Sequence, residues 1–116
     1  MTRCVLVCGG RDFADRQRVF NVLDTLHMAA PISEVVEGGA KGADALARAW
    51  CQVHRIDSTT FLADWSLGLK AGPVRNQRML DEGKPTLVVV FPGGRGTADM
   101  KRRAKAASVP VLEVNL

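Results

Sequence analysis

The sequence predicts a single α/β domain: a three-layer, Rossmann-like fold with about five mostly parallel strands and helices on both faces of the sheet. Three observations lead to this prediction. Short apolar segments alternate with segments of helical periodicity, and the apolar segments lack the polar alternation of a strand with one wet face. A glycine pair directly follows three of these segments. The length of 116 residues fits one domain, 1–116, with a modest core.

The amino-terminal half is expected to form three strands and two helices. The first helix carries an apolar stripe that includes Val19, Leu23 and Leu26, and Pro31 closes the connection behind it. Trp50 continues the stripe of the second helix, which makes it a core or interface residue, and the third strand is rich in threonine. The expected elements are strand 3–8, helix 15–29, strand 33–37, helix 42–54 and strand 56–62.

The carboxyl-terminal half continues the alternation after a longer loop, 63–72. Pro73 suits the first position of a third helix, since proline fits the start of a helix, and Gly83 with Pro85 ends that helix. The expected elements are helix 73–82, strand 86–90, a fourth helix from the glycine loop to about 107, and strand 109–114.

Composition narrows the class of partner. A net charge of +4 and a pI near 9.3 favour anionic partners without choosing between a nucleotide and a nucleic acid. No apolar run is long enough to span a membrane, and the apolar start of the chain is too short for a signal peptide, so cytoplasmic residence is expected. The three cysteines and two histidines have neither disulfide nor zinc-ligand spacing, so we expect reduced thiols and no metal.

Glycine turns are the strongest functional signal. Gly9-Gly10, Gly38-Gly39 and Gly93-Gly94 each follow an expected strand, and the last pair also precedes an expected helix. Glycine allows backbone N–H groups to approach a ligand closely, and a helix N-terminus favours anions. Because the carboxyl ends of parallel strands meet at one edge of a sheet, we expect these three turns to form one anion-binding rim.

Cations near the expected helix starts support an anionic ligand, because they oppose the helix dipole unless an anion compensates. The alternative is that they are solvated surface side chains. These residues are Arg11, Lys41, Arg75, Arg78 and Arg95. A second cluster, Lys101, Arg102, Arg103 and Lys105, is interpreted as the solvated outer face of the fourth helix, with a nucleic-acid patch as the minority interpretation.

Three further residues have two interpretations each. Asp44 either contacts a ribose hydroxyl or is a favourable carboxylate in a first helical turn. Trp65 either stacks on a base at the pocket mouth or packs the long loop against the sheet. Asn76 either recognises a base edge or phosphate or is simply an early polar residue of its helix.

The glycine motifs do not match the common nucleotide-binding signatures, since neither a Walker A motif nor the dinucleotide G-x-G-x-x-G fingerprint is present. Five segments in order nevertheless resemble the YspA, or cpYpsA-related, branch of the SLOG superfamily, which also includes the Lonely Guy phosphoribohydrolases and DprA. These segments are 10–13, 38–44, 63–65, 70–76 and 91–99. The resemblance spans nearly the whole chain and implies a Rossmann-like nucleotide-binding fold that senses or processes nucleotide derivatives.

One departure concerns catalysis. The phosphoribohydrolases of the superfamily carry a glutamate where this chain has Met100, and methionine cannot assist glycosidic cleavage. Asp99 lies one position earlier, about 100° away around a helix. Asp99 and Asp44 are therefore the candidate catalytic residues, while Asp12, Glu37 and Asp64 remain possible substitutes.

We expect binding of a nucleotide or nucleotide-derived ligand, such as a nucleoside monophosphate, ADP-ribose or an NAD-like molecule, with no certain cofactor. A phosphoribohydrolase-like N-glycosidase is the alternative and nucleic-acid binding the third hypothesis; the resemblance also implies a homo-oligomer. The expected ligand-binding residues are Gly10, Arg11, Gly38, Gly39, Lys41, Gly42, Asp44, Trp65, Arg75, Asn76, Pro92, Gly93, Gly94, Arg95, Gly96 and Thr97.

Overall fold

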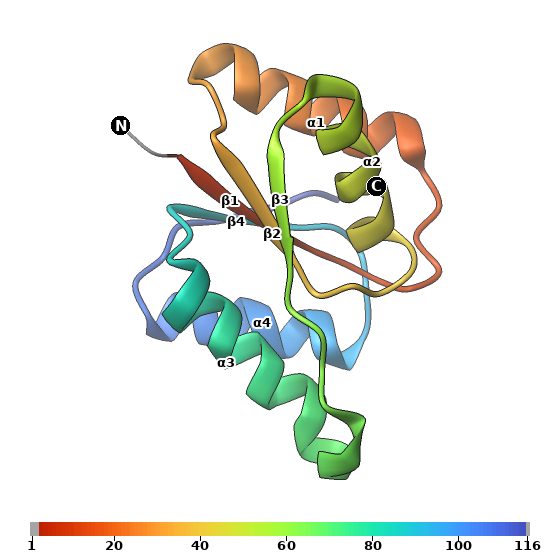
Figure 1. The fold of residues 1–116 in the computed structure, drawn as a ribbon, viewed down its shortest axis with the longest axis vertical. Helices are drawn as coiled ribbons and strands as arrows, with labels where there is room; N and C mark the ends of the chain where they lie inside the picture. Colours follow the sequence, from red (N-terminus) through yellow and green to blue (C-terminus); the bar gives the residue numbers. More distant parts are fainter. Residues whose placement is uncertain (1–2, 116) are drawn as a thin grey trace.

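The computed structural model describes residues 3–115 and contains one sheet of five parallel strands in the order β3-β2-β1-β4-β5 (Figure 1). The chain runs outward from β1 to β3 and then crosses back to β4 and β5, so the strand order reverses between β1 and β4. This confirms the expected α/β class. The strands are β1 (Cys4–Cys8), β2 (Glu34–Glu37), β3 (Asp57–Thr60), β4 (Leu87–Val90) and β5 (Val111–Glu113).

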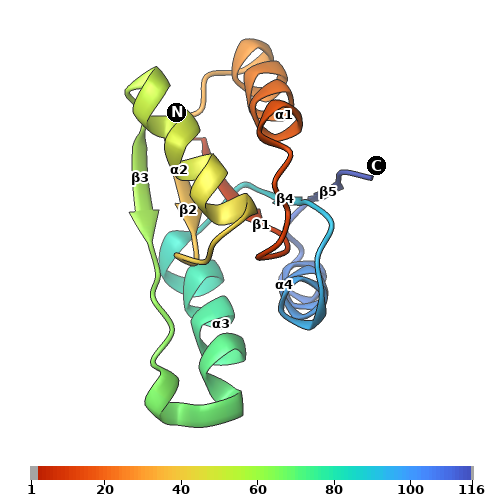
Figure 2. The same cartoon turned by 90° about the vertical axis from the view of Figure 1, so that its right-hand side faces the viewer.

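Helices cover both faces of the sheet, as the two views show (Figures 1 and 2). Alternate side chains of β1 explain this arrangement: Val5 and Val7 join the core beneath α1 and α2, whereas Leu6 and Cys8 join the core beneath α3 and α4. The helices are α1 (Arg16–Ala29), α2 (Ala43–His54), α3 (Ala71–Gly83) and α4 (Arg95–Ala106).

Trp50 belongs to the core between α1 and α2. It is fully buried, and its Nε1–H donates to Asp24 Oδ1 at 2.8 Å. Trp50 therefore needs no second subunit to cover it, and the expected homo-oligomer stays a prediction. Cys4, Cys8 and Cys51 are buried free thiols.

The expected loop at 63–72 differs from the structure. It contains a short 3-10 helix, η1 (Trp65–Lys70), which begins where Asp64 accepts hydrogen bonds from the N–H and hydroxyl of Ser66. The helix α3 then begins at Ala71, so Pro73 is its third residue; this is tolerated because the first four N–H groups of a helix have no partner within it. Arg75 is consequently more than one turn into the helix.

Two smaller features complete the fold. The strand β3 lies at the edge of the sheet and all four of its residues are exposed, unlike the buried strands expected from sequence. Across residues 3–115, none of the helices combines the length and the apolar character needed to cross a membrane.

Candidate functional site

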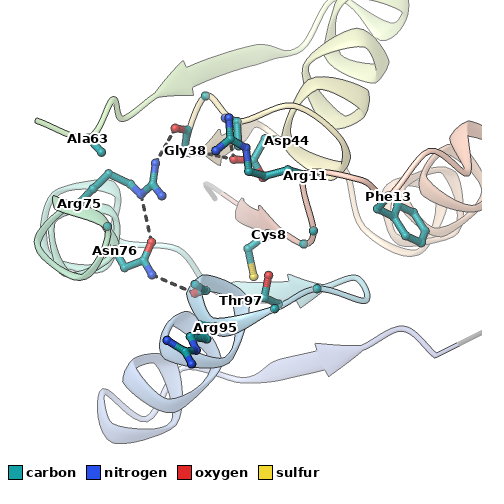
Figure 3. Close-up of a pocket in the computed structure, with 18 of the residues that line it drawn as sticks. Cys8, Arg11, Phe13, Gly38, Asp44, Ala63, Arg75, Asn76, Arg95 and Thr97 are labelled. Atoms are coloured by element: carbon teal, nitrogen blue, oxygen red, sulfur yellow. Dashed lines mark hydrogen bonds between the residues drawn. The ribbon is translucent and has the colours of Figure 1, made fainter. Parts of the chain in front are cut away.

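The three glycine turns lie together at the carboxyl ends of β1, β2 and β4, around one cavity of about 890 Å³ (Figure 3). This edge includes the point where the strand order reverses, which is where ligands bind in open α/β sheets. We call residues 9–12, 38–44 and 92–97 the glycine rim. Its members that line the cavity are Gly9, Gly10, Arg11, Asp12, Gly38, Gly39, Ala40, Asp44, Pro92, Gly93, Gly94, Arg95, Gly96 and Thr97.

Several rim glycines are required by packing between the turns. The N–H of Gly10 donates to the carbonyl of Pro92 at 2.8 Å, and a Cβ on Gly93 would lie 2.7 Å from the Gly10 nitrogen. Gly42 has φ of 76°, and a Cβ there would lie only 2.1 Å from the Gly10 carbonyl oxygen. Packing between the turns therefore requires glycine at these positions, independently of any ligand.

Gly94 and Gly96 differ from the packed glycines. Both line the cavity, yet a Cβ on either would meet no atom within 4 Å, and neither has a positive φ. They lie at the start of α4, whose first turn has neither a side-chain cap nor an acidic residue. Open space therefore lies beside both glycines at this helix start.

Arg75 crosses from α3 to the second glycine turn. Its Nη1 donates to the carbonyl of Gly38 at 2.6 Å, and its Nε donates to Asn76 Oδ1 at 3.1 Å (Figure 3). The Asn76 amide in turn donates to the carbonyl of Gly96 at 3.1 Å and to Asp99 Oδ2 at 3.0 Å. A cation is thus held at the cavity by side chains and backbone from three elements.

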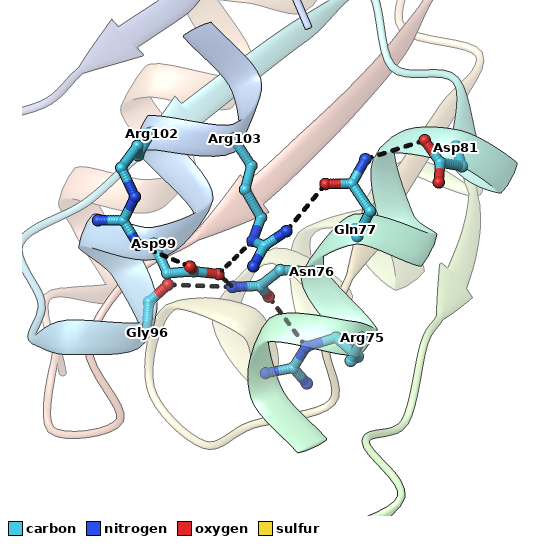
Figure 4. A network of polar contacts seen from close by, with 8 residues as sticks. All are labelled: Arg75, Asn76, Gln77, Asp81, Gly96, Asp99, Arg102 and Arg103. Carbon is cyan, nitrogen blue, oxygen red and sulfur yellow. Dashed lines mark hydrogen bonds and ion pairs between the residues drawn. The ribbon is translucent and has the colours of Figure 1, made fainter. Parts of the chain in front are cut away.

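Asp99 does not line the cavity. It lies in a polar network between the two helices (Figure 4), which we call the α3–α4 seam; its members are Asn76, Gln77 and Asp81 of α3 and Asp99, Arg102 and Arg103 of α4. Burial alone would raise the pKa of Asp99, but hydrogen bonds from Asn76 and Arg103 and the charges of Arg103 and Arg102 hold this pKa below its ordinary value. Both carboxylate oxygens of Asp99 are occupied within the seam.

Asp44 lines the cavity and is held differently. Its Oδ2 accepts from the N–H groups of Gly38 at 3.0 Å and Ala40 at 3.2 Å. Burial raises the pKa of Asp44 to about 6, and the nearby charge of Glu37 adds to this, although both hydrogen bonds act in the opposite direction. Asp44 is therefore a buried carboxylate that exchanges protons near neutral pH at the cavity wall.

Glu37 is a buried acid that supports the rim. Its side chain is fully buried and accepts from the N–H of Gly39 at 2.7 Å, from Arg48 at 2.8 Å and from the Thr60 hydroxyl. With its acceptors occupied in this way, Glu37 holds the second turn in place beside β3.

The predicted cations lie in three different settings. Arg11 and Arg95 line the cavity as exposed side chains without an ion-pair partner among residues 3–115, whereas Lys41 is exposed but does not line it. Arg78 pairs with Glu82 at 2.9 Å, away from the cavity. In α4, Lys101 pairs with Glu113, and Arg102 and Arg103 share the carboxylate of Asp99, so three of the four cations of this cluster are ion-paired rather than simply solvated.

Sequence reasoning missed part of the cavity wall. The additional lining residues are Cys8, Phe13, Leu62, Ala63, Gly72 and Met79. The places of Cys8 and Phe13 follow from strand and turn position, but those of the others depend on the course of η1 and α3.

Burial raises the pKa of the Cys8 thiol to about 12, with a contribution from the charge of Asp44, so Cys8 is not a thiolate at neutral pH. In the part of the chain that the structure describes, no cluster of acidic, histidine or cysteine side chains is suited to a metal ion.

Fold and site together define a Rossmann-like protein with a glycine-lined cavity at its strand-order reversal. Residues 3–68 match the model of the YspA, cpYpsA-related SLOG family, and the chain belongs to this family. It is 38% identical over 119 residues to the Gene 61 protein of Mycobacterium phage D29, an alignment that covers 95% of this chain and 94% of that protein.

The fold is also similar to that of a solved structure, DNA processing protein A (DprA) from Streptococcus pneumoniae. The TM-score is 0.81 at 17% sequence identity, and the match covers 99% of this chain and 51% of the DprA chain. This chain thus spans about half the length of DprA, and the likeness concerns the fold.

Proposed function

We propose that this protein binds a nucleotide or nucleotide derivative, with its phosphate at the glycine rim, as a sensor or processing module. The observation that carries the proposal is the convergence of three glycine turns, distant in sequence, on one cavity that also holds Arg75. Two cations at the mouth, Arg11 and Arg95, add attraction for an anion. The volume of about 890 Å³ lies within the range of roughly 300–1,000 Å³ typical of small-molecule sites.

The open glycines support the phosphate position. Glycine in a helix is less favourable than alanine by roughly 1 kcal/mol, and neither packing nor φ requires it at Gly96. A close approach of a ligand to the start of α4 accounts for this choice. Gly94, directly before α4, has the same open space.

Thermal-shift titration tests the proposal. AMP, GMP, CMP, ADP-ribose and NAD are added to the full chain at concentrations up to the millimolar range. A ligand at about one hundred times its Kd stabilises a protein by about 2.7 kcal/mol, which raises Tm by several degrees. Absence of stabilisation by every member of the panel would reject nucleotide binding.

A pair of arginine variants connects any stabilisation to the rim. Arg75→Ala removes the cation held at Gly38, whereas Arg78→Ala removes an exposed cation one turn further along the same helix. We expect R75A to weaken nucleotide binding at least tenfold and R78A to leave it unchanged, with helicity measured by circular dichroism for both. Equal affinities for the two variants would place the ligand elsewhere.

N-glycosidase activity is a second candidate, and Asp44 is the observation that favours it. A buried carboxylate with a pKa of about 6 beside the cavity is suited to activate water or to stabilise an oxocarbenium-like state. Met100, by contrast, is fully buried in the core beneath α3 and α4. Chromatography after incubation with AMP, GMP or CMP measures free base; release that is lost in Asp44→Asn supports this activity, and full recovery of substrate rejects it.

Nucleic-acid binding has weaker support. It is suggested by the fold shared with a DNA processing protein and by the basic character of α4. However, Lys101, Arg102 and Arg103 already have acidic partners. Binding through this helix requires a steep salt dependence that is lost in the Arg102→Ala, Arg103→Ala double variant. Single-strand binding measured at two salt concentrations would detect it.

A further inference from the structure

The cavity has two unlike walls. One is the glycine rim together with Arg75, which offers backbone donors and charge. The other is formed by Leu62, Ala63, Trp65 and Gly72, from the segment between β3 and the start of α3. Arg75 borders both walls, since Ala63 lies on the same side of the cavity in Figure 3. The second wall offers apolar surface and an indole ring, which a phosphate does not use.

Trp65 is not a core residue. Its exposed fraction is 69%, whereas Trp50 is 0% exposed. The packing of the long loop against the sheet, the alternative suggested by the sequence, would bury the indole, so it does not explain Trp65. Trp65 is nevertheless the first residue of η1, and Asp64 caps the start of this helix by accepting hydrogen bonds from Ser66. The chain thus holds an exposed aromatic ring at the cavity.

The apolar wall joins the rim directly. A Cβ on Gly39 would lie 2.7 Å from Leu62 Cδ2, so the Leu62 side chain lies over the second glycine turn. Across the wall, a Cβ on Gly72 would meet nothing within 4 Å, although Gly72 is the second residue of α3 and lines the cavity. Open space therefore lies beside the apolar wall, next to the proposed phosphate position.

We propose that Trp65 stacks on the heteroaromatic base of the ligand, which makes the ligand a base-bearing nucleotide rather than a sugar phosphate or free phosphate. This inference rests on the proposed phosphate position at the glycine rim. Base–aromatic stacking strengthens binding by about 5- to 150-fold and tolerates any base, since every base has a π-face. Purine and pyrimidine nucleotides are accordingly both accepted.

Tryptophan fluorescence of the full chain, titrated with AMP, ADP-ribose and the base-free ribose 5-phosphate, tests this inference. The chain has two tryptophans, and Trp50 is buried between α1 and α2 with its Nε1–H bonded to Asp24. A stacked base is expected to quench Trp65 emission as the site saturates. Ribose 5-phosphate should bind about 5- to 150-fold more weakly than AMP and without quenching.

Two variants identify the indole as the cause. Trp65→Ala should weaken AMP binding toward the affinity of ribose 5-phosphate while leaving ribose 5-phosphate binding unchanged, and Trp65→Phe should recover part of the loss. Because Trp65 is exposed, both variants should fold, which circular dichroism and Tm will verify. In W65F the remaining Trp50 emission should not respond to ligand, although calorimetry should still detect AMP.

The outcomes separate the two proposals. If ribose 5-phosphate binds as tightly as AMP and ADP-ribose, or if W65A weakens all three equally, stacking is overturned while the rim remains a phosphate site. If none of the three binds, the proposed function fails and the stacking inference fails with it.

Discussion

The glycine rim and the α3–α4 seam meet at Arg75 and Asn76, but they hold a buried aspartate in opposite ways. In the rim, Asp44 is held by two backbone N–H groups and forms no ion pair within residues 3–115. In the seam, Asp99 is held by two arginine side chains and an amide. Burial raises the pKa of Asp44 to about 6 although both N–H groups oppose this rise, whereas the hydrogen bonds and charges of the seam lower the pKa of Asp99.

This difference separates a carboxylate at the cavity wall from one engaged between two helices. Asp44 lines the cavity with a protonation state that changes near neutral pH, whereas Asp99 stays ionised and fully engaged behind Asn76. The turns of the rim pack closely because their glycines have no side chains, whereas the seam consists of side-chain contacts. Each contrast predicts that substitutions in the two regions affect stability in opposite ways.

The largest expected effect is at Gly42, where the rim has no room for a side chain. Gly42→Ala would strain a residue with φ of 76° and place Cβ 2.1 Å from the Gly10 carbonyl oxygen. We expect a loss of about 3–5 kcal/mol in the free energy of unfolding, measured by denaturant titration. The matched control Gly94→Ala should change it by no more than about 1 kcal/mol, because its Cβ meets nothing. Equal stability of the two variants would contradict the close packing of the turns.

The second effect concerns the seam. Asp99→Asn removes the charge that holds Arg102 and Arg103 and should lower the free energy of unfolding at pH 7 by about 1–3 kcal/mol. The control Glu113→Gln removes the exposed partner of Lys101 on the same helix and should leave stability close to that of wild type, because exposed ion pairs contribute little. Because the folded pKa of Asp99 lies below its ordinary value of 3.8, the carboxylate stabilises the fold above pH 3.8. This stabilisation is lost as the pH falls through the folded pKa. A D99N protein as stable as E113Q would show that the seam is not structural.

The contribution of Asp44 to stability, which Asp44→Asn removes, should depend on pH with the opposite sign to that of Asp99. Because the folded pKa of Asp44 is raised to about 6 from 3.8, its protonated form stabilises the fold at low pH, and this stability is lost as the pH rises through about 6. We expect wild type to lose about 2–3 kcal/mol from this group between pH 4 and 7. Asparagine can still accept from Gly38 and Ala40, so D44N should lack this slope and be no less stable than wild type at pH 7. Unfolding curves across this pH range test the sign; a D44N protein with the wild-type slope would reject the assignment.

Most of the fold could be predicted from sequence because local signals agree with one another. Within residues 3–115 the expected strands and helices lie near their expected positions, since apolar periodicity and glycine breaks mark them, apart from the polar strand β3. The exception is η1, which has no apolar period and depends on the Asp64 cap and on Gly68, with φ of 66°. The segment η1 leads directly into α3, which begins at Ala71 rather than at Pro73, so Arg75 lies beyond its first turn.

The site could be predicted only where position follows from topology. The strand ends determine where Gly10, Gly38 and Gly93 lie. Whether Asp99 lines the cavity depends instead on the direction of its side chain on α4. The signal for the seam was nevertheless present: Arg102 and Arg103 follow Asp99 at i+3 and i+4, the spacing of ion pairs on a helix. The long-range contact of Arg103 with Gln77, in contrast, could not be predicted without the packing of α3 on α4.

The smallest expected effect on stability is at Gly96, where rim and seam adjoin. Gly96→Ala should leave the protein as stable as wild type or raise the free energy of unfolding by about 0.5–1 kcal/mol, because Cβ meets nothing within 4 Å and alanine favours the helix. The carbonyl of Gly96 still accepts from Asn76, so the seam should persist. If the start of α4 approaches a phosphate, the added methyl group should weaken AMP binding in the same titration. A G96A protein with higher Tm and unchanged affinity would mean that the ligand does not approach this helix start, and glycine there would have no explanation in either region.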